Sequence, residues 1–265
     1  MLQFIKKHWV YWLRIANVAL QEAFVSRWSN LLFLLGKAVR LSMSLAFLLI
    51  IRQNVTMIAG YTGDQLVAFF LVFQFLDTIV QVVYRGVYVF DSKIRNGEFD
   101  FYLAQPISPL FRSLLGKPDI NDVVFLLPST VISFYILSTL SLQASLPTVI
   151  WFALLLCNSF LIATALHIVV LAFAVIFVDV QNGIWIYRDI TKLGQFPISI
   201  YRGAVRFAAT FIVPVGVMIT VPAEVLLNVP QTIGLAPALT IGPAFFIGSV
   251  VLWRWSLKRY SSASS

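Results

Sequence analysis

Long apolar stretches separated by short polar segments dominate the chain, and each long stretch is a candidate membrane span. A transmembrane helix needs about 20 mostly apolar residues in a row. The pattern predicts five such helices, at residues 31–51, 66–87, 123–140, 148–178 and 233–255. Lys37 and Arg40 interrupt the first stretch, so this span is alternatively placed at 38–59, with both basic groups reaching toward one membrane face.

A sixth crossing is predicted between residues 179 and 230, where the residues leave two alternatives. Hydropathy favours residues 207–227, which are apolar but contain prolines. The other candidate, 181–196, is short and polar, and protein would have to shield it from lipid. The proline-containing stretch would then be a re-entrant or outer-surface element. Glu224, which follows Pro222, is expected to reach water.

The N-terminal segment 3–28 has the apolar spacing of an amphipathic helix. The stripe that recurs at helical intervals consists of Ile5, Trp9, Trp12, Leu13, Ala16, Leu20, Ala23 and Phe24. Lys7, Arg14 and Gln21 fall off this stripe. We expect residues 1–30 to lie on the inner membrane surface. The alternative is that this helix docks on the protein's own spans.

Composition supports a membrane protein and excludes several other classes. Apolar residues make up 60% of the chain and charged residues only 11%, whereas a soluble domain carries about 25% charged residues. This excludes a soluble enzyme, a disordered tail and a secreted disulfide scaffold. Cys157 is the single cysteine, so neither an internal disulfide nor a cysteine metal site is expected. We therefore predict one all-α, polytopic domain over residues 1–265, with six transmembrane helices and an N-terminal amphipathic surface helix.

The basic residues are concentrated on one side of the predicted spans. Segments 1–30, 85–120 and 253–265 contain many Lys and Arg residues, whereas 53–65, 141–147 and 228–232 contain none. By the positive-inside rule, both termini and the 88–120 loop lie in the cytoplasm. This asymmetry explains the net charge of +8 without a nucleic-acid partner, and membrane lipid is the expected surrounding.

Motifs for nucleotide and metal chemistry are missing from the sequence. It contains no Gly-x-x-x-x-Gly-Lys-Ser/Thr loop, no dinucleotide fingerprint and no Gly-x-Ser-x-Gly elbow. His8 and His167 are the only histidines, which rules out a histidine-rich metal site. We expect no cofactor in this chain.

The cytoplasmic loop 91–111 has the signals of a short helix. Gly97 can end the preceding helix, Glu98 and Asp100 fall in the first turn of a new one, and Pro106 stops it. Phe99, Tyr102 and Leu103 would form one apolar edge. The loop is either a docking knob for a soluble partner or an ordinary loop whose aromatic residues rest on the bilayer.

Two stretches of the chain resemble the six-span permeases of type-2 ABC exporters. The loop motif is Gly97-Glu98-Phe99-Asp100-x-x-Leu103-x-x-Pro106-Ile107-Ser108-Pro109. The later stretch contains Phe196-Pro197-Ile198-x-Ile200-Tyr201, Val205-Arg206, Ile212-Val213-Pro214 and Pro222. The surface helix, the short outer loops and the basic C-terminal end agree with this class.

The resemblance implies a subunit of a larger machine in a prokaryotic cytoplasmic membrane. The loop would carry the coupling helix, with Glu98, Phe99, Asp100 and Leu103 contacting a separate ATP-binding cassette subunit. ATP and Mg²⁺ would bind on that partner. A second permease subunit, identical or related, would complete the pathway, and the short fifth span at 181–196 would be favoured over 207–227.

Polar residues inside the predicted spans are candidates for the translocation path or for packing. Gln74, Asp77 and Gln81 share one side of the second span, and His167 lies in the fourth. Intramembrane polar groups face a wet cavity or pair with neighbouring helices. Without a second buried acid at helical spacing, interhelical packing is favoured.

Two other functions remain as alternatives. Asp91, Glu98, Asp100, Asp119 and Asp122 gather on the cytoplasmic side, where a membrane-embedded Mg²⁺-dependent enzyme acting on lipid phosphates would need them. Phe125 and the lack of a second acidic motif oppose this. The other alternative is a membrane scaffold that transports nothing.

Overall fold

The computed structural model describes residues 2–54, 56–140, 145–177 and 183–261. The first half contains α1 (Leu2–Val25), α2 (Arg27–Asn54), β1 (Met57–Ile58), β2 (Tyr61–Thr62), α3 (Gly63–Tyr84), η1 (Arg85–Val89), α4 (Phe90–Arg95), α5 (Phe99–Ala104), α6 (Pro109–Leu115) and α7 (Ile120–Thr139). The second half contains α8 (Leu146–Ile176), α9 (Gly183–Thr191), η2 (Lys192–Gln195), η3 (Ile198–Ile200), α10 (Gly203–Phe207), η4 (Ala208–Ile212), η5 (Gly216–Thr220), α11 (Val221–Leu226) and α12 (Leu235–Leu257).

The all-α, polytopic membrane fold predicted from the sequence is confirmed. Five helices in the described residues are long and apolar enough to cross a membrane: α2, α3 with its continuation to Arg95, α7, α8 and α12. A sixth is added if a bent helix pair at 203–226 counts as one span. The chain is therefore an integral membrane protein.

The first span ends before residue 55, because a two-stranded hairpin follows it. β1 and β2 pair antiparallel, and Ala59 and Gly60 turn between them with φ of 50° and 90°. The alternative that extended this span to residue 59 is therefore wrong. Thr62 then starts α3 through a capping box, in which Gln65 N donates to the Thr62 hydroxyl at 3.3 Å and Thr62 N to the Gln65 side chain at 2.9 Å.

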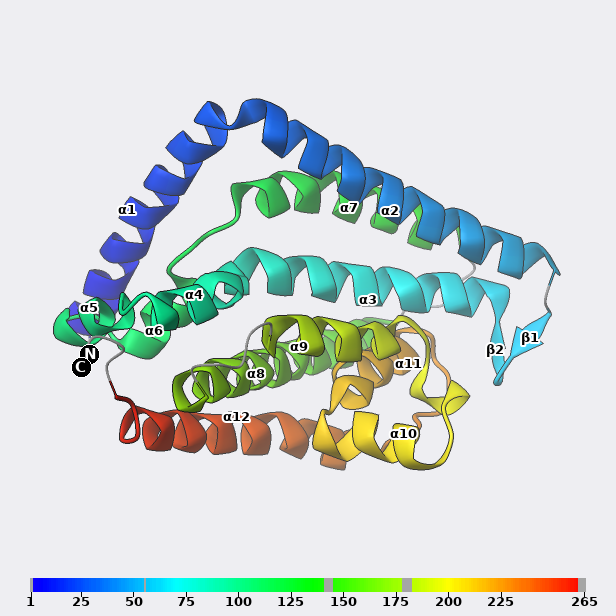
Figure 1. The fold of residues 1–265 in the computed structure, drawn as a ribbon. Helices are drawn as coiled ribbons and strands as arrows, with labels where there is room; N and C mark the ends of the chain where they lie inside the picture. Colours follow the sequence, from blue (N-terminus) through cyan, green and yellow to red (C-terminus); the bar gives the residue numbers. More distant parts are fainter. Residues whose placement is uncertain (1, 55, 141–144, 178–182, 262–265) are drawn as a thin grey trace.

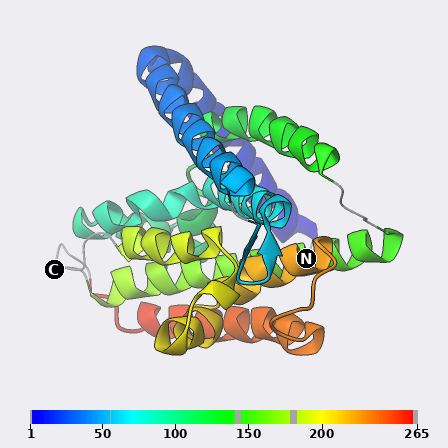
Figure 2. The ribbon, with the colours of Figure 1, turned by 90° about the vertical axis from the view of Figure 1, so that its right-hand side faces the viewer.

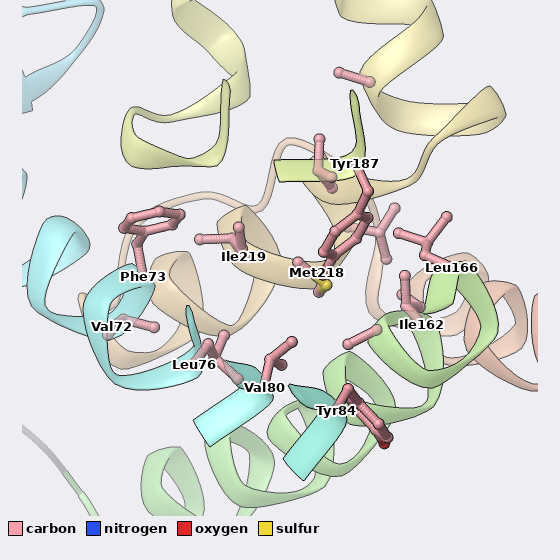
Figure 3. Packing of buried hydrophobic residues seen from close by; sticks show 14 of the residues in the cluster. Val72, Phe73, Leu76, Val80, Tyr84, Ile162, Leu166, Tyr187, Met218 and Ile219 are labelled. Carbon is pink, nitrogen blue, oxygen red and sulfur yellow. The ribbon is translucent and has the colours of Figure 1, made fainter. Parts of the chain in front are cut away.

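The spans form layers around a buried centre (Figures 1 and 2). α3 and α8 are mostly buried, whereas α2, α7 and α12 expose most of their surface. α2 and α7 cover one side of α3, and α12 lies on the far side of α8 (Figure 1). Figure 3 shows the central contact, where Phe73 and Leu76 of α3 approach Ile219, and Ile162 and Leu166 of α8 lie near Tyr187. The exposed apolar faces of the outer helices suit contact with lipid.

The region of the fifth crossing is broken into short helices. α9 and η2 together are thirteen residues long, about 21 Å from their helical rises and short of the ~30 Å hydrocarbon core. After η2, two helical segments, Gly203–Ile212 and Gly216–Leu226, meet at a bend of 77°. The main chain of Met218 accepts a hydrogen bond from Ser159 in the middle of α8, at 2.6 Å.

Beyond the bend, the chain returns toward the N-terminal end of α8. There, the Thr148 hydroxyl lies 3.2 Å from the Asn228 side-chain oxygen. Residues 203–226 are either a broken span or a re-entrant element, so both alternatives for this crossing stay predictions. Residues 181 and 182 of the shorter candidate lie outside the described part of the chain, as do residues 141–144.

Of the two alternatives for the N-terminal helix, docking on the protein is confirmed for one face, whereas its place on the membrane surface stays a prediction. One face docks on the protein: His8 is buried, and its Nε2 accepts the Ser108 N–H at 3.1 Å. The apolar stripe faces outward instead, with Trp9 59% and Phe24 73% exposed. Because α1 meets α2 at a sharp elbow (Figure 1), this exposed stripe suits a position at the membrane surface.

Candidate functional site

The predicted short helix in the loop is present as α5, and a glycine sets its direction. The preceding helix, α4, ends with Gly97 N donating to the Ile94 carbonyl at 3.1 Å. Gly97 adopts φ of 71°, a left-handed conformation that only glycine takes without strain. α5 ends before Gln105, whose extended backbone leads into Pro106. Both end signals read from the sequence therefore act as expected.

Phe99 holds α5 against the membrane domain. Its side chain is fully buried, and its ring lies 5.2 Å from Phe90 of α4, 6.1 Å from Trp253 of α12 and 5.1 Å from Tyr260. The first and last of these ring pairs are nearly perpendicular, which is a favourable aromatic geometry. The expectation that Phe99 contacts a partner is therefore wrong, because this ring anchors the base of the helix instead.

The segment after α12 also contacts α5 through a hydrogen bond. The Tyr260 hydroxyl donates to Asp100 Oδ1 at 3.0 Å. Burial and this carboxylate raise the pKa of Tyr260 to about 12, so the phenol stays protonated. Asp100, predicted as a partner contact, thus has a structural role within the chain.

Several residues in the outer part of α5 and just after it are exposed and partly apolar. Phe101 is 67% exposed and Leu103 is 41% exposed, and the neighbouring Ala104, Gln105 and Pro106 are exposed as well. We call these five residues the α5 tip. Leu103 was predicted to lie on this surface, whereas Phe101 was missed because the helical edge was assigned to Phe99, Tyr102 and Leu103.

Glu98 lies beside the tip and pairs with a lysine of α4. Its carboxylate accepts a hydrogen bond from Lys93, and this contact holds the pKa of Glu98 below its usual range. The pair is partly exposed, so it contributes little to stability. The pair places two opposite charges, which neutralise each other, at the edge of the α5 tip.

The polar residues predicted inside the second span bond to one another and, through Asp77, to another helix. Asp77 forms an ion pair with Arg188 of α9 and accepts a hydrogen bond from Gln81 at 2.7 Å. Gln74 donates to Thr78 on its own helix at 3.0 Å. Asp77 and Arg188 side chains are 9% and 11% exposed, so the pair is nearly dry and joins α3 to α9.

A second ion pair, which the sequence pattern did not predict, extends this network to the outer layer. Lys37 of α2 pairs with Asp122 of α7, and its Nζ lies 3.5 Å from Gln81 Oε1. Lys37 therefore points into the bundle rather than toward a membrane face. The sequence did contain a signal for this pair, because Lys37 and Asp122 have opposite charges and lie near the same end of two predicted spans. The network joins four helices and supports interhelical packing, the interpretation favoured from the sequence.

His167 lies at the centre of the bundle between two tyrosines. Its ring is 4.7 Å from Tyr84 and 4.4 Å from Tyr187. Nδ1 lies 2.7 Å from the Ala163 carbonyl, whereas Nε2 has no partner among the described residues. These contacts join α8 to α3 and α9, which is a packing role.

Three of the five acids predicted to lie on the cytoplasmic side form ion pairs. Asp122 pairs with Lys37, Asp119 with Arg85 at 3.0 Å, and Glu98 with Lys93. In the described residues, no group of three His, Cys, Asp or Glu side chains is arranged to hold a metal ion. The geometry therefore gives the magnesium-dependent enzyme alternative no support.

At the other end of the bundle, Glu224 is buried rather than near water. Its carboxylate accepts hydrogen bonds from the Tyr61 hydroxyl and the Thr232 N–H, both at 2.8 Å. The expectation that Glu224 reaches water is wrong, because the β2 strand and the 228–232 connection cover it. This contact ties the hairpin to α11.

The fold defines an all-α, polytopic membrane protein. Residues 38–264 match the family model of ABC-2 family transporter proteins. The match covers most of the chain, so the chain belongs to the ABC-2 transporter family and is a membrane permease. Comparison with curated proteins and with solved structures gives no match.

Proposed function

We propose that this chain is the membrane-spanning subunit of an ABC exporter, driven by a separate ATPase subunit through loop 91–111. The observation that carries the proposal is the construction of α5, which presents an exposed apolar tip on a base anchored by Phe99. Exposed aromatic and aliphatic side chains on a fixed helix are suited to a protein groove. ATP and Mg²⁺ belong to the partner ATPase.

The anchor gives a direct route from the tip to two membrane spans. Phe90 belongs to α4, which continues α3 through η1, and Trp253 belongs to α12. A displacement of α5 therefore acts on the second and last spans together. Rigid-body movement of packed helices is a common way to switch between two states, and here it would alternate access to the export path.

The proposed orientation places both termini, α5 and α6 in the cytoplasm. These parts lie at one end of the bundle (Figure 1), and the basic residues of 1–30, 85–120 and 253–265 accompany them. The hairpin at 57–62 lies at the opposite end (Figure 1). We place the protein in a prokaryotic cytoplasmic membrane, paired with a second permease subunit of the same or a related sequence.

The coupling role is tested by removing the apolar tip without touching the anchor. In the complex with its ATPase, Phe101→Ala with Leu103→Ala should reduce co-purification of the ATPase or its permease-dependent ATP turnover about tenfold or more, as loss of two interface anchors predicts. Membrane insertion should be unchanged, because both side chains are exposed.

The matched control removes the same two residue types from a different exposed surface. Leu127→Ala with Phe134→Ala acts on α7, where these side chains are 70% and 75% exposed. Equal ATP turnover and equal co-purification for both double variants and the wild type would contradict the coupling role.

Orientation is tested by labelling single cysteines in a Cys157→Ser background. Asn96→Cys, beside α5, should react only with reagent supplied from the cytoplasmic side. Met57→Cys, in the hairpin and 61% exposed, should react only from outside. The reverse pattern would overturn the charge argument.

A further inference from the structure

Two adjoining cavities lie beneath α1, between this helix and the α6–α7 region. The larger, of about 400 Å³, reaches from α1 to η1, α4 and α6. The smaller, of about 250 Å³, continues toward the start of α7. Both are lined by Ala19, Glu22 and Lys117. We call the two together the α1 pocket.

The α1 pocket carries more positive than negative charge. Its lining cations are Arg85, Lys93, Arg112 and Lys117, and its acids are Glu22 and Asp119. Arg85 and Lys93 are already paired, with Asp119 and Glu98. Arg112 donates a hydrogen bond to Gln105, and neither Arg112 nor Lys117 has an ion pair in the described part of the chain. Two positive charges without a paired carboxylate therefore line the pocket, against the single carboxylate of Glu22.

The pocket also contains a buried hydroxyl without a partner. Ser113 is 2% exposed and lines the larger cavity, and its Oγ makes no hydrogen bond among the described residues. A buried polar group left unpaired costs free energy, which an occupant with acceptor oxygens relieves. Arg112 supports the same wall, because its guanidinium stacks 3.7 Å above the Tyr102 ring.

The wall of the pocket is closely packed and therefore pre-formed. η1 touches α6 at Gly86, where an added Cβ would lie 2.6 Å from the Ser113 carbonyl oxygen. The opposite wall is α1, whose Ala23 belongs to the apolar stripe and lines the smaller cavity. The pocket thus joins a polar, basic floor to an apolar helix face that suits lipid.

We propose that the α1 pocket binds the phosphate headgroup of an anionic membrane phospholipid, with its acyl chains lying along the exposed stripe of α1. Basic pockets between membrane helices on the cytoplasmic side are suited to anionic headgroups. Arg112 and Lys117 bind the phosphate oxygens, and the Ser113 hydroxyl donates to one of them. The assignment to the inner leaflet rests on the orientation proposed above, whereas the binding itself does not.

The test titrates the purified full-length chain, in a neutral detergent, with fluorescent phosphatidylglycerol and with the same label on phosphatidylcholine. We expect phosphatidylglycerol to bind at least tenfold tighter. Arg112→Gln with Lys117→Gln should weaken its binding about 30-fold, since each basic group near a lipid surface contributes a few-fold factor. Equal affinity for the two lipids would overturn the proposal.

A matched control removes two positive charges from the outer surface of α1. Lys7 and Arg14 are exposed and do not line the pocket, so Lys7→Gln with Arg14→Gln should change affinity less than about twofold. Equal losses in the two double variants would show that only net charge matters and would refute the site.

Two further arms separate a specific lipid site from nonspecific adsorption and from a site for free phosphate. Ala19→Phe places a bulky ring where it lines both cavities, without changing charge, and should abolish the preference for phosphatidylglycerol, with helical content by circular dichroism unchanged. Retained preference in the folded variant would overturn the proposal. Inorganic phosphate at matched ionic strength should not displace the lipid, and displacement would assign the pocket to free phosphate. None of these measurements involves an ATPase, so they can fail independently of the coupling role.

Discussion

The buried ring of Phe99 determines how strongly α5 is held against the membrane domain. Phe99→Ala removes a fully buried ring that contacts four aromatic rings. Replacing a buried phenylalanine by alanine lowers the free energy of unfolding by about 3–5 kcal/mol. Because the ring lies at the edge of the membrane domain rather than among the spans, we expect most of this cost to appear as release of α5. The equilibrium between docked and released α5 should then shift by roughly two to three orders of magnitude.

Hydrogen–deuterium exchange of the full-length chain in lipid nanodiscs measures this release. The amides of 99–105 should lose protection by about 100-fold or more in Phe99→Ala, whereas amides in α3 and α8 should keep theirs. Phe99→Leu retains an apolar side chain of similar bulk and should lose less than about 1.5 kcal/mol. The graded response links protection to the filling of this one site.

The control is the same substitution at an exposed ring. Phe134→Ala on α7, where the side chain is 75% exposed, should leave exchange in 99–105 unchanged. Wild-type protection of α5 in a folded Phe99→Ala protein would falsify the anchor. A loss spread evenly over all spans would instead show that the ring stabilises the whole bundle.

Three further predictions follow from single contacts. Gly97→Ala should destabilise the loop by about 1–2 kcal/mol, because alanine is strained at φ of 71°, and exchange at 97–100 should rise. Asp77→Asn should lower the thermal midpoint more than Asp77→Asn combined with Arg188→Met, because the single change leaves a buried charge unpaired; equal or larger losses in the double variant would contradict this. Tyr260→Phe should weaken the docking of α5 by about 1 kcal/mol. Since the pKa of Tyr260 is raised to about 12, the stabilisation by its hydroxyl should persist below pH 10 and vanish as pH rises through 12. Identical hydrogen exchange of α5 in the variant and the wild type at neutral pH would refute this contribution.

The spans and both ends of α5 could be predicted because their signals are local. A run of apolar residues fixes a membrane helix whatever its neighbours are, and this located four of the spans to within a few residues. Gly97 and Pro106 act on the backbone beside them. The positions of these elements therefore followed from short stretches of sequence.

The orientation of α5 could not be predicted in the same way. Phe99 and Phe101 are both aromatic and two residues apart, and only the rings of Trp253 and Tyr260 decide which of them is buried. These partners lie more than a hundred residues further along the chain. The Lys37–Asp122 pair was missed for a similar reason, since it depends on which spans become neighbours.

The length of α8 has a consequence for the lipid environment. Its 31 residues extend about 46 Å, whereas a helix inclined at 40° needs only about 39 Å to cross a 30 Å hydrocarbon layer. The surplus of about 7 Å must project into the headgroups or force a steeper lean. Lipids with shorter or longer tails would therefore change the tilt of this helix, so the geometry of the protein depends on the acyl length of the host bilayer.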